Sequence, residues 1–90
     1  MSIQDKAGQL TTIAEEAAGA YGVLAALQAA QNTIESFGEQ MIAVLGGSGT
    51  GASDVMRVCA AASYAIDEAK PVCQSAIATF KEVASGHIRG

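Results

Sequence analysis

A glycine-rich segment divides this chain near its midpoint, and that single break limits the possible folds more than any other feature. Residues 42–55 read IAVLGGSGTGASDV, and four of the ten glycines fall within residues 46–51. The stretches on both sides are rich in alanine and have apolar positions at helical spacing. The sequence therefore predicts an all-α antiparallel two-helix hairpin, with helices over about 3–45 and 54–85 and a turn over about 46–53.

The second half of the chain has a regular apolar seam. Its members follow alternating steps of four and three residues: Val55, Cys59, Ala62, Ile66, Ala69, Cys73, Ala76, Phe80 and Val83. A repeat of 3.5 residues indicates a helix that packs on another with a left-handed twist. Pro71 interrupts this helix, because proline removes one backbone hydrogen bond and clashes with the preceding turn. We expect a kink near Lys70.

The first half carries two apolar stripes. One follows the same alternating steps: Leu10, Ile13, Ala17, Ala20, Leu24, Leu27, Gln31, Ile34, Gly38, Met41 and Leu45. The second covers a neighbouring face: Val23, Ala30, Ile34, Phe37, Met41 and Val44. One partner helix covers only one stripe, so we expect a further chain to cover the other and a four-helix bundle to form. The residues expected at that interface are Val23, Leu24, Leu27, Ile34, Phe37, Met41 and Val44.

Composition also favours association. Half of the residues are hydrophobic, but alanine supplies much of that share, and only 4% are aromatic. Small side chains bury little area each, at about 25 cal/mol per Å². A single hairpin of this composition has marginal stability, which favours a partner.

The charge pattern excludes several partners. The net charge is −4, and the five basic residues are scattered, so we expect no nucleic-acid partner. No apolar run approaches the roughly 20 residues that span a bilayer, so we expect no stable membrane insertion. Residues 1–10 lack the apolar stretch of a signal peptide. We therefore expect either a cytoplasmic protein or one that is secreted without a cleavable signal peptide.

No set of residues supports catalysis, a cofactor or a metal ion. Gly47, Gly49 and Ala52 fit the dinucleotide fingerprint, with Asp67 about 20 residues after the first glycine. The helical spacing on both sides of this loop leaves no strands for a nucleotide-binding sheet. Cys59 and Cys73 would lie about 21 Å apart along one helix and cannot bond to each other. They fit buried apolar positions or an interchain disulfide. We expect no enzymatic activity.

At residues 45–49 the chain resembles the small WXG proteins of type VII (ESX) secretion, the early secreted antigenic target family. Those proteins are about this long, and each is a helical hairpin whose turn carries Trp-x-Gly. Here Leu45 stands in the position of the Trp, followed by Gly46, and Gly47 stands in that of the Gly. The resemblance implies a secreted, non-enzymatic substrate or co-secreted partner that dimerises with itself or with a sister hairpin protein. It also implies a partly buried Leu45 and, since glycine adopts positive φ without strain, a positive φ at Gly47.

The family's export motif is Tyr-x-x-x-Asp/Glu, usually just beyond the second helix. The match here is Tyr64 with Glu68, inside the predicted second helix and off its seam. The resemblance implies that a secretion ATPase contacts this pair if both side chains stay exposed.

Two other functions fit the sequence. One is a structural subunit of a filament, shell or phage particle, in which Ala/Gly-rich helices pack side by side. The other is a membrane-active peptide, which the acidic balance disfavours because such peptides usually carry basic faces.

Overall fold

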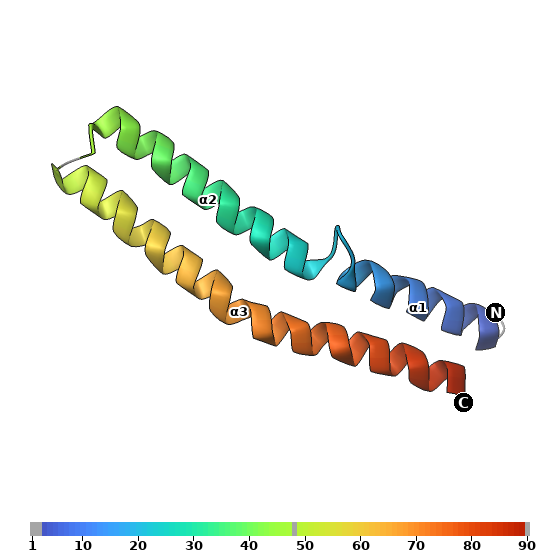
Figure 1. The fold of residues 1–90 in the computed structure, drawn as a ribbon. Coiled ribbons are helices and arrows are strands. Elements are labelled where there is room, and N and C mark those ends of the chain that lie inside the picture. Colours follow the sequence, from blue (N-terminus) through green and yellow to red (C-terminus); the bar gives the residue numbers. More distant parts are fainter. Residues whose placement is uncertain (1–2, 48, 90) are drawn as a thin grey trace. The chain divides into compact units, whose positions relative to one another are not determined.

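The computed structural model describes residues 3–47 and 49–89, which form three helices joined by two turns (Figure 1). These helices are α1 (Ile3–Ala18), α2 (Val23–Leu45) and α3 (Gly49–Arg89). The described residues contain no strand, so the predicted all-α class is confirmed. The chain divides into two compact units. We call Leu27–Ala69 the hairpin unit; the terminal unit combines the chain up to Ala26 with the chain from Lys70 onward.

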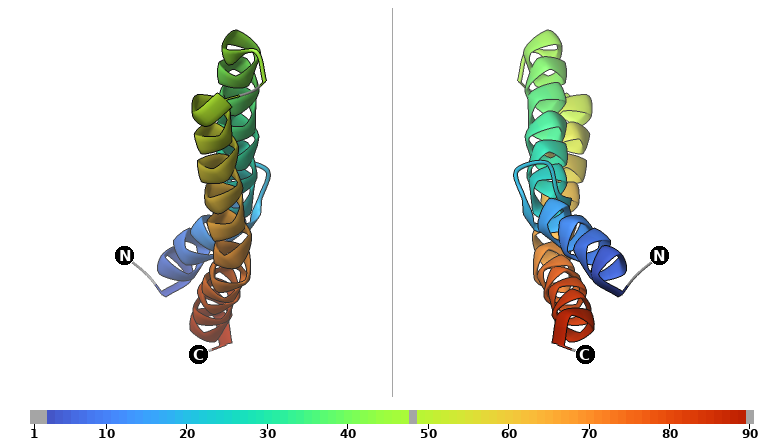
Figure 2. Two further views of the ribbon diagram at one scale, coloured as in Figure 1. Left: turned by 90° about the vertical axis from the view of Figure 1, so that its left-hand side faces the viewer. Right: turned by 90° about the vertical axis from the view of Figure 1, so that its right-hand side faces the viewer.

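The hairpin unit contains most of α2 and the first half of α3, which lie side by side in both views of Figure 2. The chain reverses at Gly46 and Gly47, so the two helices are antiparallel, as the sequence predicts. The residues of the seam between them are buried or half-buried: Leu27, Gln31, Ile34, Gly38 and Ile42 on α2, and Ala52, Val55, Cys59, Ala62 and Ile66 on α3. Gln31, the one polar residue of the predicted seam, donates a hydrogen bond to Asp67 across the two helices at 3.4 Å.

The turn of the hairpin is shorter than predicted. α3 begins at Gly49, so residues 50–53, expected in the turn, are helical. Ala52 is fully buried, and the side chain of Leu45 lies over Gly51. These contacts with the end of α2 offset the low helix propensity of the glycines, because most helical stability in proteins comes from tertiary packing.

The predicted first helix over 3–45 is two helices, and this prediction is wrong at residues 19–22. The chain turns there, with the Gly22 amide donating to the Gly19 carbonyl at 3.0 Å. A Cβ on Gly22 would overlap the carbonyl group of Ala17. Only glycine therefore fits at Gly22, and the turn follows from two glycines three residues apart.

In the terminal unit the buried positions differ from the predicted seam. The buried apolar residues are Ala7 and Ala14 on α1 and Ile77 and Ala84 on α3. Ala76 and Val83, predicted to lie in the seam, are exposed, as is Ile13 on α1. On α3 the buried residue comes one position after the predicted one. A straight helix with 3.6 residues per turn rotates away from a strict 3.5-residue repeat by about 20° per heptad, so the covered face shifts along the helix.

α3 continues without interruption through Pro71 and past Gly86 to Arg89, beyond the predicted end near residue 85. The proline therefore does not divide the second helix into two. The boundary between the two units falls at Lys70, where the kink is expected. The kink therefore stays a prediction.

The interior of the described chain consists mostly of alanine. The buried apolar side chains are Ala7, Ala14, Ala52, Ile77 and Ala84, and none of the large side chains described is fully buried. At about 25 cal/mol per Å², a set of this size contributes little to the free energy of unfolding.

Candidate protein–protein interface

Three exposed large apolar side chains of α2 share one face in the hairpin unit. Phe37 is 62% exposed, Met41 54% and Val44 89%. Their spacing of four and three residues places them on one face of the helix. They form a continuous apolar strip that the described chain leaves uncovered.

The position of this strip follows from the seam. Phe37, Met41 and Val44 each come one residue before a residue that faces α3, namely Gly38, Ile42 and Leu45. Val58 on α3 likewise comes one residue before Cys59 and is 58% exposed. In two antiparallel right-handed helices, residues one position before the seam point to the same side of the pair. We call Phe37, Met41, Val44 and Val58 the apolar side.

Residues one position after the seam point to the opposite side, which is polar. Glu35 follows Ile34 and Glu39 follows Gly38 on α2, and Asp67 follows Ile66 on α3. The two sides of the hairpin unit therefore differ in chemistry. The apolar side carries large apolar side chains together with Asp54, and the opposite side carries acidic side chains together with the exposed Met56.

The structure divides the interface set expected from the sequence. Val23, Leu24, Leu27 and Ile34 are half-buried, while Phe37, Met41 and Val44 are exposed. The first four are therefore partly covered within the chain, and the last three remain available. Whether a further chain covers them stays a prediction.

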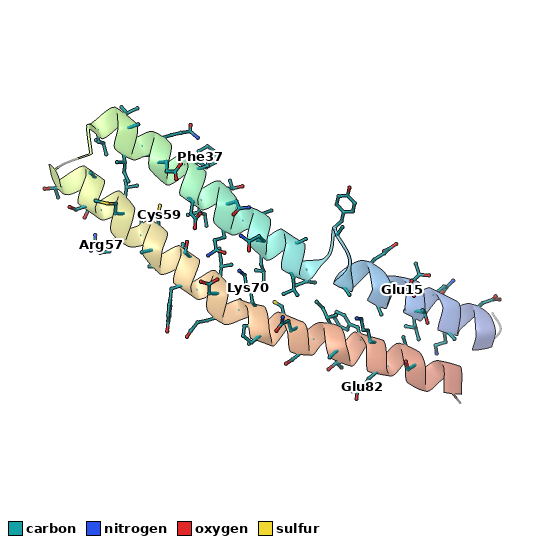
Figure 3. All side chains as sticks on the ribbon, viewed as in Figure 1. Glu15, Phe37, Arg57, Cys59, Lys70 and Glu82 are labelled. Atoms are coloured by element: carbon teal, nitrogen blue, oxygen red, sulfur yellow. The ribbon has the colours of Figure 1, made fainter. Side chains whose placement is uncertain are left out.

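α2 approaches α3 closely at Gly38. The Sγ atom of Cys59 lies 2.6 Å from the position that a Cβ would take on Gly38. The same thiol donates a hydrogen bond to the carbonyl oxygen of Ile34 at 3.9 Å. Cys59 therefore faces α2, as Figure 3 shows, and the missing side chain of Gly38 makes room for it.

Gly47 has the positive φ that the resemblance implies. Gly46 has φ of 82° and Gly47 has φ of 77°, and Gly49 is also in this region at 92°. Leu45 is 44% exposed, with its δ-carbons 3.4 and 3.5 Å from the Cβ position of Gly51. Its side chain thus rests on the first turn of α3. Ser48 lies outside the described residues.

Tyr64 and Glu68 lie on successive turns of α3, away from the seam. Tyr64 is 66% exposed, and Glu68 is also exposed. Within one chain both side chains are accessible to a partner. Their exposure in an assembled form stays a prediction.

The dinucleotide fingerprint has no structural support. Residues 42–45 are helical and not a strand, and Asp67 accepts the hydrogen bond from Gln31. In the described part of the chain, no group of His, Cys, Asp and Glu is placed to hold a metal ion. Cys59 and Cys73 are both free, half-buried thiols.

The sequence analysis does not identify the roles of two residues. Gly38 belongs to the predicted seam, but its missing side chain opposite Cys59 is also a signal of close approach. Tyr21, in the turn after α1, is fully exposed at 101%. Its position between Gly19 and Gly22 is the sequence signal that this aromatic residue lies in a turn.

None of the described helices is long and apolar enough to cross a membrane. Comparisons of the chain with known protein families, with curated proteins and with solved structures find no match.

Proposed function

We propose that this protein acts by helical association and has no catalytic step. In this proposal the apolar side of one hairpin unit packs on a second hairpin, from another copy or from a sister protein, to form a four-helix bundle. The observation that carries the proposal is the strip of Phe37, Met41 and Val44, which is exposed on one side of the unit.

The alanine-rich interior supports association. Because the buried side chains are mostly alanine and the larger apolar side chains of the seam are only half-buried, the chain alone gains less hydrophobic stabilisation than a fully covered core would give. Covering Phe37, Met41, Val44 and Val58 would remove large apolar side chains from water. The intermolecular interface would then bury larger side chains than the interior of the single chain does.

We further propose that the assembled protein is a type VII secretion substrate or a co-secreted partner. The support is the resemblance of the turn at Leu45, Gly46 and Gly47, together with a helical hairpin around it. Tyr64 and Glu68 are exposed on α3, where a secretion ATPase can contact them. Export by this route needs no cleavable signal peptide.

Sedimentation velocity at micromolar concentration tests the association. We expect a folded species larger than the 9.0 kDa chain. Phe37→Asp should dissociate it, while Glu82→Ala, an exposed position on α3, should leave it unchanged. Ile34→Asp is a less specific variant, because Ile34 is half-buried within the hairpin itself. A well-folded monomer would contradict the proposal.

Export is tested by measuring the protein in the medium of its native host, with the membrane ATPase of the secretion system present and deleted. We expect release only when the ATPase is present. Release of the protein as part of particles, or its assembly into long filaments, would favour a structural subunit instead. Leakage of vesicles at micromolar protein would favour a membrane-active peptide.

A further inference from the structure

An open groove lies between α2 and α3 on the side of the hairpin unit that carries the acidic residues. Its volume is about 220 Å³. The residues that line it are Glu35, Gly38, Glu39, Ile42, Met56 and Cys59. Within this lining the Cys59 thiol lies beside Gly38, which has no side chain, and donates to the carbonyl oxygen of Ile34. The space beside them is not filled.

The charges of α2 are concentrated at this groove. Glu35 and Glu39 are the only charged residues in α2, and both line it. Like charges four residues apart on a helix repel each other and lower its stability. Among the described residues neither carboxylate has an ion pair. The groove therefore combines an apolar wall with two uncompensated negative charges.

No side chain of the hairpin unit can supply the missing positive charge. Arg57 is the only basic residue within Leu27–Ala69. Its guanidinium is paired with the Asp54 carboxylate at 2.8 Å. A cation that fills the groove must come from elsewhere.

We propose that this groove binds an arginine side chain of a partner protein. The aliphatic stem would lie on Ile42, Met56 and the thiol of Cys59, since long basic side chains cover apolar surface with their methylene groups. The planar guanidinium would donate hydrogen bonds to both Glu35 and Glu39. A volume of about 220 Å³ suits one long side chain and not a whole helix. The site lies opposite the apolar side, so both can be occupied at once.

The test uses the full-length protein and the alkylation of its two thiols by iodoacetamide. Cys59 lines the groove, and Cys73, also half-buried, lies in the terminal unit and serves as an internal control. The probe is an alanine-based helical peptide with one arginine and one leucine four residues apart. Its control has citrulline, which is uncharged, in place of the arginine.

We expect the arginine peptide to slow alkylation of Cys59 in a saturable way and to leave Cys73 unchanged. The citrulline peptide should need an about fivefold higher concentration, because it lacks the charge that two exposed carboxylates attract. The double variant Glu35→Gln/Glu39→Gln should need the same higher concentration of the arginine peptide. Its helical content should match that of the parent protein.

Equal slowing of both thiols, or equal effects of the two peptides, would overturn this proposal. A second result would also overturn it. If Cys59 is alkylated without peptide only after the protein is diluted, a second copy covers the groove. Phe37→Asp should leave the effect of the peptide unchanged, since Phe37 lies on the other side. Failure of the groove and failure of the proposed association are therefore distinguishable.

Discussion

The thiol of Cys59 on α3 occupies the space that a β-carbon would take at Gly38 on α2, with 2.6 Å between the two positions. Gly38→Ala gains about 1 kcal/mol from helix propensity but costs about 1–3 kcal/mol through overpacking. We expect a net loss of about 1 kcal/mol in the free energy of unfolding, measured by urea unfolding at fixed protein concentration.

The effect of Gly38→Ala on the free energy of unfolding should have the opposite sign when the sulfur of Cys59 is removed. In a Cys59→Ala background the remaining neighbours of an added Cβ are at 3.8 Å, an ordinary contact distance. Gly38→Ala should then stabilise the protein. A double-mutant cycle measures the coupling between the two positions, and additive effects would show that the thiol and Gly38 do not restrict each other.

The turn after α1 should depend on Gly22. Gly22→Ala places a Cβ against the carbonyl group of Ala17, a backbone group that cannot move aside without altering the turn. We expect a loss of about 1–3 kcal/mol in the free energy of unfolding. Gly8→Ala is the matched control, because nothing lies within 4 Å of its added Cβ. It should stabilise α1 by up to about 1 kcal/mol.

Association should respond to the side of α2 that receives a charge. Val44→Asp adds a carboxylate to the apolar side, where burial would leave it unpaired. Ala43→Asp adds the same charge to an exposed neighbouring residue that does not belong to this side. We expect the dissociation constant to rise about tenfold or more for Val44→Asp, a loss of at least about 1.4 kcal/mol, and to change little for Ala43→Asp. Sedimentation over a range of concentrations distinguishes them, and equal effects would exclude the apolar side as the interface.

The export motif gives a separate prediction. Tyr64→Ala and Glu68→Ala should each reduce the amount of protein in the medium while circular dichroism and sedimentation remain unchanged, because both side chains are exposed. Val72→Ala is a suitable control, since Val72 is 70% exposed on the same helix outside the motif. Unchanged export in both variants would show that Tyr64 and Glu68 are not a signal.

The sequence predicted the hairpin because its two strongest signals are local. The glycine cluster at residues 46–51 determines where the chain reverses, and positive φ at Gly47 follows from the need for a tight turn. The heptad spacing of α3 located Val55, Cys59, Ala62 and Ile66 on the covered face. These features depend on residues close together in the chain.

Two errors arose where neighbouring residues are both apolar, so that the sequence does not show which one is covered. Ala76 and Ile77 are both apolar, so a strict heptad count chose Ala76, although Ile77 is the buried residue. Similarly, Met41 was assigned to the seam, but Ile42, one residue later, is better covered. At the break over residues 19–22, Gly22 lies so close to the Ala17 carbonyl that no Cβ fits, and spacing alone does not reveal this approach. The groove beside Gly38 likewise depends on how residues far apart in the chain pack.

The exposure of the two tyrosines has a consequence for spectroscopy. The chain has no tryptophan, so its intrinsic ultraviolet fluorescence comes mainly from Tyr21 and Tyr64. Both rings are already largely in water in the folded chain, at 101% and 66% exposure. Unfolding therefore changes their surroundings little, whereas a partner that covers either ring transfers it to an apolar environment. In this protein the quenching of tyrosine emission by acrylamide should therefore report docking more than folding.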